Sequence, residues 1–155
     1  MFRDDVVAVM PDLRAFGRFL CRDREAADDL VQNTILTALD KQERFEPGTN
    51  LKSWLFTIMR NRYYGDLRAQ RRGRRALDEG DLDSLTPSPL AEPASTMADL
   101  SGALWKLNPR YREALVLVGA VGFSYEEAAE LCACSVGTLK ARVSRARRLL
   151  AEQLG

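Results

Sequence analysis

The sequence contains no histidine among its 155 residues. Histidine is the side chain most often used as a general base near neutral pH, and it is also the commonest metal ligand. Its absence argues against most enzyme classes, so we expect no catalytic residues, no cofactor, no metal and no small-molecule substrate. The three cysteines cannot form an even set of disulfides or, without histidine, a four-ligand zinc site, so a reducing cytoplasm is the expected compartment.

Long apolar runs are missing as well. The longest, from Ala114 to Phe123, contains two glycines and is far too short to span a bilayer. Near the start of the chain, Asp4 and Asp5 stand where a signal peptide has basic residues followed by an apolar stretch. We therefore expect no membrane among the partners.

The net charge is only +1, but charge is distributed unevenly along the chain. Residues 1–76 carry 15 basic and 11 acidic side chains, residues 77–101 carry six acidic and no basic ones, and residues 102–155 carry eight basic and five acidic ones. The middle segment also contains three prolines, a composition that disfavours helices and strands. We predict two small domains joined by an acidic linker, which is either simply solvated or competes with nucleic acid for the basic faces.

Outside this linker, apolar residues recur at intervals of three and four, which predicts an all-α fold. In the first domain, one helix is expected to begin at Pro11. Its predicted core side chains are Leu13, Phe16 and Leu20. Asp23 can cap a second helix over residues 24–41, and Asn50 can cap a third over residues 51–72.

Three helices are predicted in the second domain. The Asn-Pro pair at 108–109 combines a cap with a first-turn proline. Ser124 and Glu127 have the spacing of a capping box. Ser135 then follows a short turn and can cap the last helix, over residues 136–154.

The last predicted helix has an apolar stripe and a basic face. At about 100° per residue, a narrow stripe contains Leu139, Val143, Ala146 and Leu150. The opposite and flanking positions are Gly137, Thr138, Lys140, Ala141, Ser144, Arg145, Arg147 and Arg148. A short helix, a tight turn and a basic helix form the helix-turn-helix arrangement, whose second helix reads a major groove. The alternative is a basic helix that is merely solvated.

The third helix of the first domain combines cations with aromatic side chains. Residues 60–75 contain seven arginines and one aspartate. The aromatic residues just before or within this stretch are Trp54, Phe56, Tyr63 and Tyr64. Aromatic faces that stack bases, beside cations that follow a backbone, suit single-stranded nucleic acid, and Trp54, Asn61 and Arg68 share one ridge. The alternative is that Trp54 or Tyr63 packs in the core.

Two smaller constellations have simpler interpretations. Cys132 and Cys134 suggest a metal or redox site, but only one other cysteine exists, and we interpret them as small core residues. The adjacent carboxylates of Asp28 and Asp29 diverge by about 100° on a helix, so we interpret them as a solvated or partner-binding face.

Four segments carry a family resemblance. They are DDLVQNT at 28–34, NLKSWLFTIMRN at 50–61, SYEEAA at 124–129 and VGTLKAR at 136–142. Together they resemble the extracytoplasmic-function (ECF) group of bacterial RNA polymerase sigma factors, over about residues 8–75 and 98–154. The resemblance implies a transcription initiation factor with sigma region 2 in residues 1–76 and sigma region 4 in residues 102–155.

The resemblance also implies three sets of contacts. Core RNA polymerase would be bound through its β′ clamp helices by Asp29, Gln32, Asn33 and Leu36. The promoter −10 element would be opened, and a flipped base held, by Glu46, Pro47, Gly48, Thr49, Asn50, Trp54 and Asn61, with Arg68 on the same ridge. The −35 element would be read by Thr138, Lys140, Ala141, Arg142, Ser144, Arg145 and Arg148, while region 4 also touches the β-flap.

Residues 44–54, RFEPGTNLKSW, resemble in particular the subclass that runs the general stress response. Members of that subclass are held by a small helical anti-sigma factor and released by a response regulator with a sigma-like domain. Two alternatives stay open. A sigma-like mimic or adaptor that sequesters an anti-sigma factor would share the two-domain shape, but no receiver domain is predicted. A plain helix-turn-helix regulator leaves the aromatic and basic surface of residues 54–75 unexplained.

Overall fold

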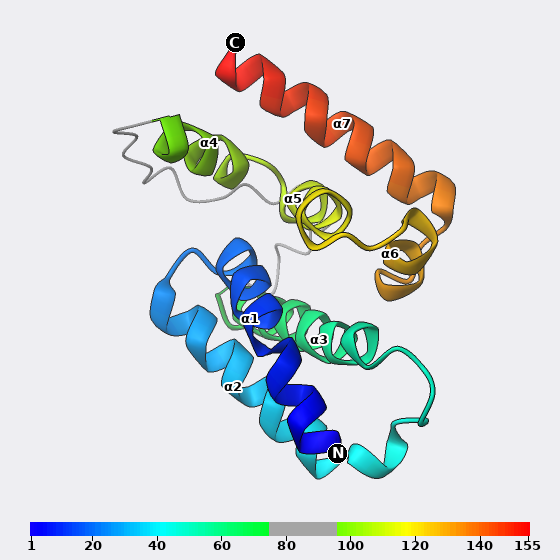
Figure 1. Cartoon of the computed structure of the whole chain (residues 1–155). Coiled ribbons are helices and arrows are strands. Elements are labelled where there is room, and N and C mark those ends of the chain that lie inside the picture. Colours follow the sequence, from blue (N-terminus) through cyan, green and yellow to red (C-terminus); the bar gives the residue numbers. More distant parts are fainter. Residues whose placement is uncertain (75–95) are drawn as a thin grey trace. The chain divides into compact units, whose positions relative to one another are not determined.

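The computed structural model describes residues 1–74 and 96–155, and within them the regular elements are all helical (Figure 1). The chain divides into two compact units, Met1–Glu79 and Gly80–Gly155. The predicted all-α class is therefore confirmed. In the described part of the chain, no helix combines the length and the apolarity needed to cross a membrane.

The first unit is a bundle of three helices that pack pairwise against one another. Its elements are α1 (Phe2–Leu20), α2 (Arg24–Asp40), the short 3-10 helix η1 (Gln42–Arg44) and α3 (Leu51–Arg74). The side chains of Phe16 and Phe56 stack in its core, with ring centroids 5.0 Å apart. Gly17 lets α1 approach α2 closely, because a Cβ there would lie 3.3 Å from Cγ2 of Val31.

The predicted caps and core of this unit are confirmed. The Asp23 carboxylate accepts a hydrogen bond from the Ala26 amide at 3.2 Å, and Oδ1 of Asn50 accepts one from the Ser53 amide at 3.1 Å. Leu13, Phe16 and Leu20 are buried.

The prediction that the first helix begins at Pro11 is wrong, because α1 begins at Phe2 and Pro11 lies inside it. A proline in a helix interior removes one hydrogen bond and disfavours the turn before it. Here Val6, which is 2% exposed, anchors the turns that precede Pro11 in the core, and tertiary packing outweighs the local signal.

The second unit contains α4 (Thr96–Trp105), α5 (Pro109–Val116), the π-helical turn η3 (Leu117–Val121), α6 (Tyr125–Leu131) and α7 (Val136–Leu154). The three predicted caps are confirmed. Asn108 accepts from the Arg110 amide at 2.9 Å, Ser124 and Glu127 form a complete capping box, and Ser135 accepts from the Thr138 amide at 3.0 Å.

Helix α4 was not predicted, and it changes the C-terminal boundary of the linker. The linker was expected to reach residue 101, but α4 begins at Thr96. Ala103 and Leu104 are buried, and α4 packs against α7, so burial of its apolar face stabilises the helix. The prolines and acids further upstream dominated the composition of the segment. Residues 77–95 of the predicted linker lie outside the described residues.

Candidate nucleic-acid and protein interfaces

A groove of about 480 Å³ opens in the first unit beside the start of α3. It is lined by Thr37, Lys41, Arg44, Trp54, Thr57, Ile58, Asn61 and Arg62, and we call it the Trp54 groove. It brings together Trp54 and Asn61, which the sequence predicts, while Arg68 is exposed but does not line it. An indole and an amide beside several cations form a surface that suits an unpaired base and its phosphate.

Of the three lining cations, Lys41 and Arg44 were missed by sequence reasoning, and Arg62 was included only as one of the seven arginines of residues 60–75. Lys41 and Arg44 follow the end of α2, and Arg62 lies one turn after Ile58 on α3. Arg62 also pairs with Asp66, with Nε and Oδ2 3.4 Å apart. The spacing of Arg62 from Trp54 on one helix was a usable signal, but only the packing of α2 on α3 brings Lys41 and Arg44 to the same groove.

The aromatic residues near the arginines divide into two groups. Phe56 and Tyr64 are buried in the core and so cannot stack on bases. Trp54 and Tyr63 are half-buried. The guanidinium of Arg60 is itself buried, 4.7 Å from the Tyr64 ring centroid, so this arginine has a structural role. Fewer aromatic and basic side chains of residues 54–75 are therefore available to nucleic acid than the sequence implied.

The loop over residues 46–50 is exposed and has its own local hydrogen bonds. Its turn is closed by Thr49, whose amide and hydroxyl both donate to the Glu46 carbonyl, at 3.2 and 2.6 Å. Gly48 has φ +90°, a conformation that side chains with a Cβ rarely adopt. The loop thus has a defined shape before any ligand binds.

The predicted polymerase contacts lie on one face of α2, where Asp29, Gln32 and Leu36 are exposed and Asn33 is half-buried. The sequence spacing of Asp29, Gln32, Asn33 and Leu36 places them along one side of the helix, and Leu36 is 56% exposed. Gln32 and Leu36 border a groove of about 460 Å³ between α1 and α2, which Met10 and Ile35 also line.

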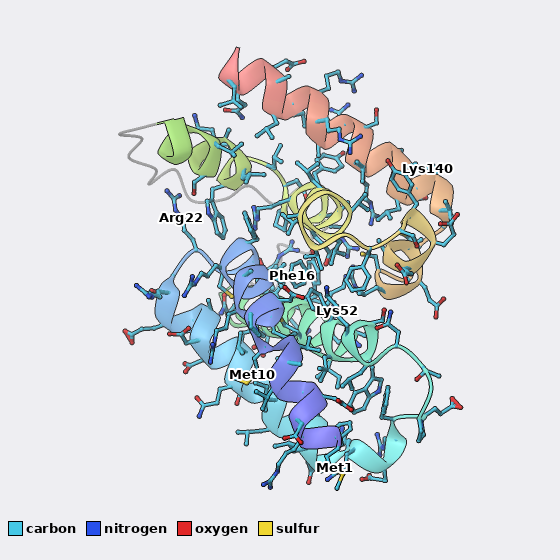
Figure 2. The ribbon with its side chains drawn as sticks, viewed as in Figure 1. Met1, Met10, Phe16, Arg22, Lys52 and Lys140 are labelled. Carbon is cyan, nitrogen blue, oxygen red and sulfur yellow. The ribbon has the colours of Figure 1, made fainter. Side chains whose placement is uncertain are left out.

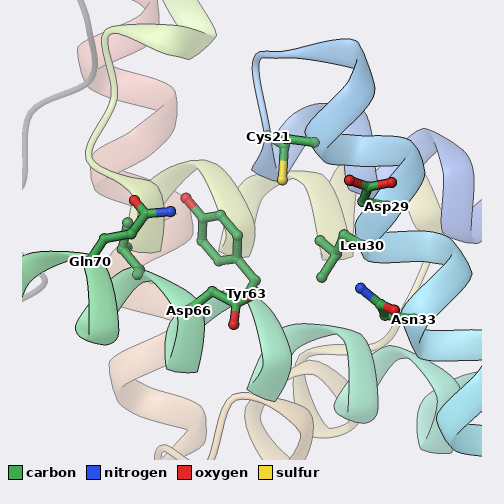
Figure 3. Close-up of a pocket in the computed structure, with 9 residues that line it drawn as sticks. Cys21, Asp29, Leu30, Asn33, Tyr63, Asp66 and Gln70 are labelled. Atoms are coloured by element: carbon green, nitrogen blue, oxygen red, sulfur yellow. The ribbon is translucent and has the colours of Figure 1, made fainter. Parts of the chain in front are cut away.

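On the other side of this face, a pocket of about 310 Å³ is lined by residues of both α2 and α3. Figure 3 shows Asp29 and Asn33 on α2 facing Tyr63, Asp66 and Gln70 on α3. An exposed leucine with carboxylates and amides around it has the composition of a protein-binding surface, with an apolar centre and a polar rim.

Helix α7 presents the predicted basic face to solvent. Leu139, Val143 and Ala146 are buried, and Leu150 is half-buried, so the apolar stripe faces the core. The exposed predicted positions are Thr138, Lys140, Ala141, Ser144, Arg145 and Arg148. Arg142 differs, because it is half-buried.

Two of the α7 cations lie over aromatic rings of neighbouring helices. Nζ of Lys140, which projects from the first turns of α7 (Figure 2), is 5.5 Å from the ring centroid of Tyr125. The guanidinium of Arg145 is 5.9 Å from the ring centroid of Tyr111. These contacts limit the conformations of two side chains that otherwise point to solvent.

The paired carboxylates of Asp28 and Asp29 are both exposed on α2, and each lines one of the two hollows beside it, whereas Cys132 lies in the core of the second unit. Cys132 is buried, and its Sγ donates to Oε1 of Glu113 at 3.5 Å, so it is a core residue as predicted. Cys134 is half-buried. Among residues 1–74 and 96–155, no group of three or more histidine, cysteine or acidic side chains could hold a metal ion.

Comparison with known proteins relates these surfaces to a family. Residues 6–73 match the Sigma-70 region 2 model, and residues 98–150 match the Sigma-70, region 4 model. The chain is 47% identical over 152 residues to the ECF RNA polymerase sigma factor EcfG of Rhodopseudomonas palustris. The aligned residues make up 98% of this chain and 84% of that protein.

Two solved structures are similar as well. The sigma factor RpoE of Bartonella quintana, solved in complex with the anti-sigma factor NepR, has a TM-score of 0.82 at 44% identity, over 99% of this chain and 96% of that one. CnrH, solved with the cytosolic domain of CnrY, has a TM-score of 0.72 at 28% identity, over 99% and 86%. With both sigma regions matched in order, the chain belongs to the ECF sigma factors of RNA polymerase.

Proposed function

We propose that this sigma factor divides promoter recognition between two surfaces, with the −10 element at the Trp54 groove and the −35 element at α7. The Trp54 groove carries the proposal, because it joins an aromatic face, the Asn61 amide and the cations Lys41, Arg44 and Arg62 in one hollow. A plain helix-turn-helix regulator has no need of such a site.

At the −10 element, the groove would hold an unstacked base together with the backbone beside it. Extruding a base costs a few kcal/mol, which stacking and hydrogen bonds in a pocket must offset. Trp54 offers an aromatic face and Asn61 offers both a donor and an acceptor. The exposed loop from Glu46 to Asn50 would add contacts to the same strand, and Arg68 would contact its backbone further along α3.

At the −35 element, α7 would enter the major groove. Ala141 and Ser144 are small and exposed, which permits a close approach to base edges. Lys140, Arg145 and Arg148 would contact bases or phosphates, with Thr138 at the helix start. Arg142 is half-buried, so it would support the −35 surface by packing against neighbouring side chains more than by contacting DNA directly.

The exposed face of α2 would bind the β′ clamp helices of core polymerase. Leu36 would form the apolar centre of this contact, and Asp29, Gln32 and Asn33 its polar rim. The second unit would bind the β-flap. With core RNA polymerase as its partner, the protein would act in the cytoplasm.

We further propose control by a small helical anti-sigma factor in the general stress response. The complex of the Bartonella relative with the anti-sigma factor NepR supports an anti-sigma partner. Residues 44–54, which resemble the stress-response subclass, support the narrower assignment. NepR of Bartonella quintana is a suitable first probe, and stable binding to the full chain is the expected result.

The decisive experiment is transcription with the full chain and core RNA polymerase on templates with randomised −35 and −10 elements. We expect transcripts from a subset of templates that share both elements, and none from core polymerase alone. Binding to NepR without any promoter-dependent transcript would instead indicate a sigma-like mimic. Duplex binding without core polymerase binding would indicate a plain helix-turn-helix regulator.

A further inference from the structure

Three aromatic rings from separate segments meet at one end of the first unit. The Phe45 and Trp54 ring centroids are 5.3 Å apart, and Phe2 lies 5.9 Å from Phe45 and 6.1 Å from Trp54. Figure 1 shows the corresponding end of α1 beside the segment that joins α2 to α3. These separations lie within the range of favourable aromatic pairs.

Phe2 is held in place by α1, which is itself anchored in the unit. Val6 is buried one turn further along the helix. Oδ2 of Asp12 lies 2.9 Å from Nζ of Lys52, an ion pair that joins α1 to the first turn of α3. The position of Phe2 relative to α3 is therefore set by core packing as well as by its own ring contacts.

The loop that follows Phe45 has mainly local contacts of its own. Thr49 bonds to Glu46, and Asn50 bonds to the first turn of α3. Phe45 is half-buried, whereas residues 46–50 are exposed. The Phe45 ring thus connects the loop to α3 through Trp54 and to α1 through Phe2.

We propose that Phe2 is a positioning residue for −10 recognition, which orients the Trp54 indole and holds the loop of residues 45–50 without touching DNA. This inference rests on the proposed function of the Trp54 groove. Trp54 lines that groove and also contacts Phe2, so the ring at position 2 restricts the indole from behind. An indole and a loop held in their bound conformation lose less freedom when a base binds.

The test uses holoenzyme assembled from the full chain and core polymerase, with single-stranded −10 oligonucleotides and their single-base variants as probes. Phe2→Ala is expected to weaken binding about two- to tenfold, as loss of aromatic pairing implies, and to reduce the preference among bases. Core polymerase affinity and binding to a −35 duplex should not change. Val7→Ala, at the adjacent exposed position of α1, is the matched control and should leave all these values unchanged.

Two further variants separate positioning from simple filling of space. Phe2→Leu retains an apolar side chain but removes the ring. Compared with Phe2→Ala, it should recover thermal stability but not the preference among −10 bases. Phe2→Tyr retains the ring and should restore both. If Phe2→Leu recovers base preference fully, or if Phe2→Ala never loses it, the positioning role is wrong.

Asn61→Ala distinguishes failure of this inference from failure of the proposed site. If Asn61→Ala weakens oligonucleotide binding and Phe2→Ala does not, the inference about Phe2 fails alone. If neither variant changes binding, the assignment of the −10 element to the Trp54 groove fails, and the inference fails with it.

Discussion

The guanidinium of Arg112 lies 4.2 Å from the ring centroid of Trp105, which joins the end of α4 to α5 through a buried cation. Nη1 of Arg112 also donates to the Leu107 carbonyl at 3.0 Å, in the turn between the two helices. Arg112 is only 2% exposed. This deeply buried side chain links α4 to the helix-turn-helix, because its planar guanidinium donates a hydrogen bond to a carbonyl and also contacts an aromatic ring.

Replacing Arg112 with alanine should therefore destabilise the second unit. Loss of a charge-assisted hydrogen bond and a desolvated cation–π contact implies about 2–4 kcal/mol. Hydrogen exchange should show faster exchange in α4, α5 and α7, with the first unit unaffected. Arg148→Ala is the control, because Arg148 is exposed and should leave exchange unchanged. Unchanged protection in Arg112→Ala would show that the turn is held by other contacts.

Two glycines of the first unit should respond in opposite ways. Nothing lies within 4 Å of a Cβ built at Gly65, inside α3, so Gly65→Ala should stabilise the protein by about 0.5–1 kcal/mol. At Gly17, a Cβ would already lie 3.3 Å from Val31, so Gly17→Leu should destabilise by about 1–3 kcal/mol. Urea unfolding measures both. A stable Gly17→Leu variant would mean that α1 and α2 separate easily.

The −35 surface should respond to Arg145. Loss of a base or phosphate contact costs about 1–3 kcal/mol, so Arg145→Ala should weaken binding to a −35 duplex by about five- to 150-fold. Core polymerase binding, measured by co-elution, should be retained. Glu152→Gln, which changes charge at an exposed position near the end of α7, should have little effect. Loss of core polymerase binding in Arg145→Ala would indicate that this face of α7 contacts the polymerase rather than the −35 element.

The −10 surface should respond to Asn61. Removing the amide should slow opening of duplex promoters and weaken base discrimination on single-stranded −10 oligonucleotides, while −35 duplex binding stays the same. Arg68→Ala is an informative comparison, because Arg68 lies outside the Trp54 groove and should reduce affinity uniformly across bases. Retained base preference in Asn61→Ala would make Asn61 a surface residue without a recognition role.

The polymerase surface should respond to Leu36. A charge at the apolar centre of an interface is desolvated without a partner, so Leu36→Asp should reduce core polymerase affinity by at least about tenfold. Because Leu36 is exposed, the variant should fold normally, which circular dichroism would check. Ala8→Asp, at an exposed position of α1, provides a control for added charge. Normal assembly of the Leu36→Asp variant with core polymerase would rule out this face of α2.

Sequence reasoning was most successful where the signal is local. The caps at Asp23, Asn50, Asn108 and Ser135 form the expected hydrogen bonds, since each cap joins residues only two or three positions apart. The apolar stripe of α7 is recognisable for a similar reason, because helical periodicity places its members on one face regardless of what packs there.

The sequence by itself thus determined the helical class, the helix caps and the basic face of α7. Only the tertiary structure decided that α1 continues through Pro11, that Arg112 is buried and that Phe2 meets Trp54. In each of these cases a local preference is overruled or completed by side chains from another helix. Burial and ring contacts of this kind depend on how helices pack, and the pattern of residues within one helix does not specify which side chain of another helix will meet it.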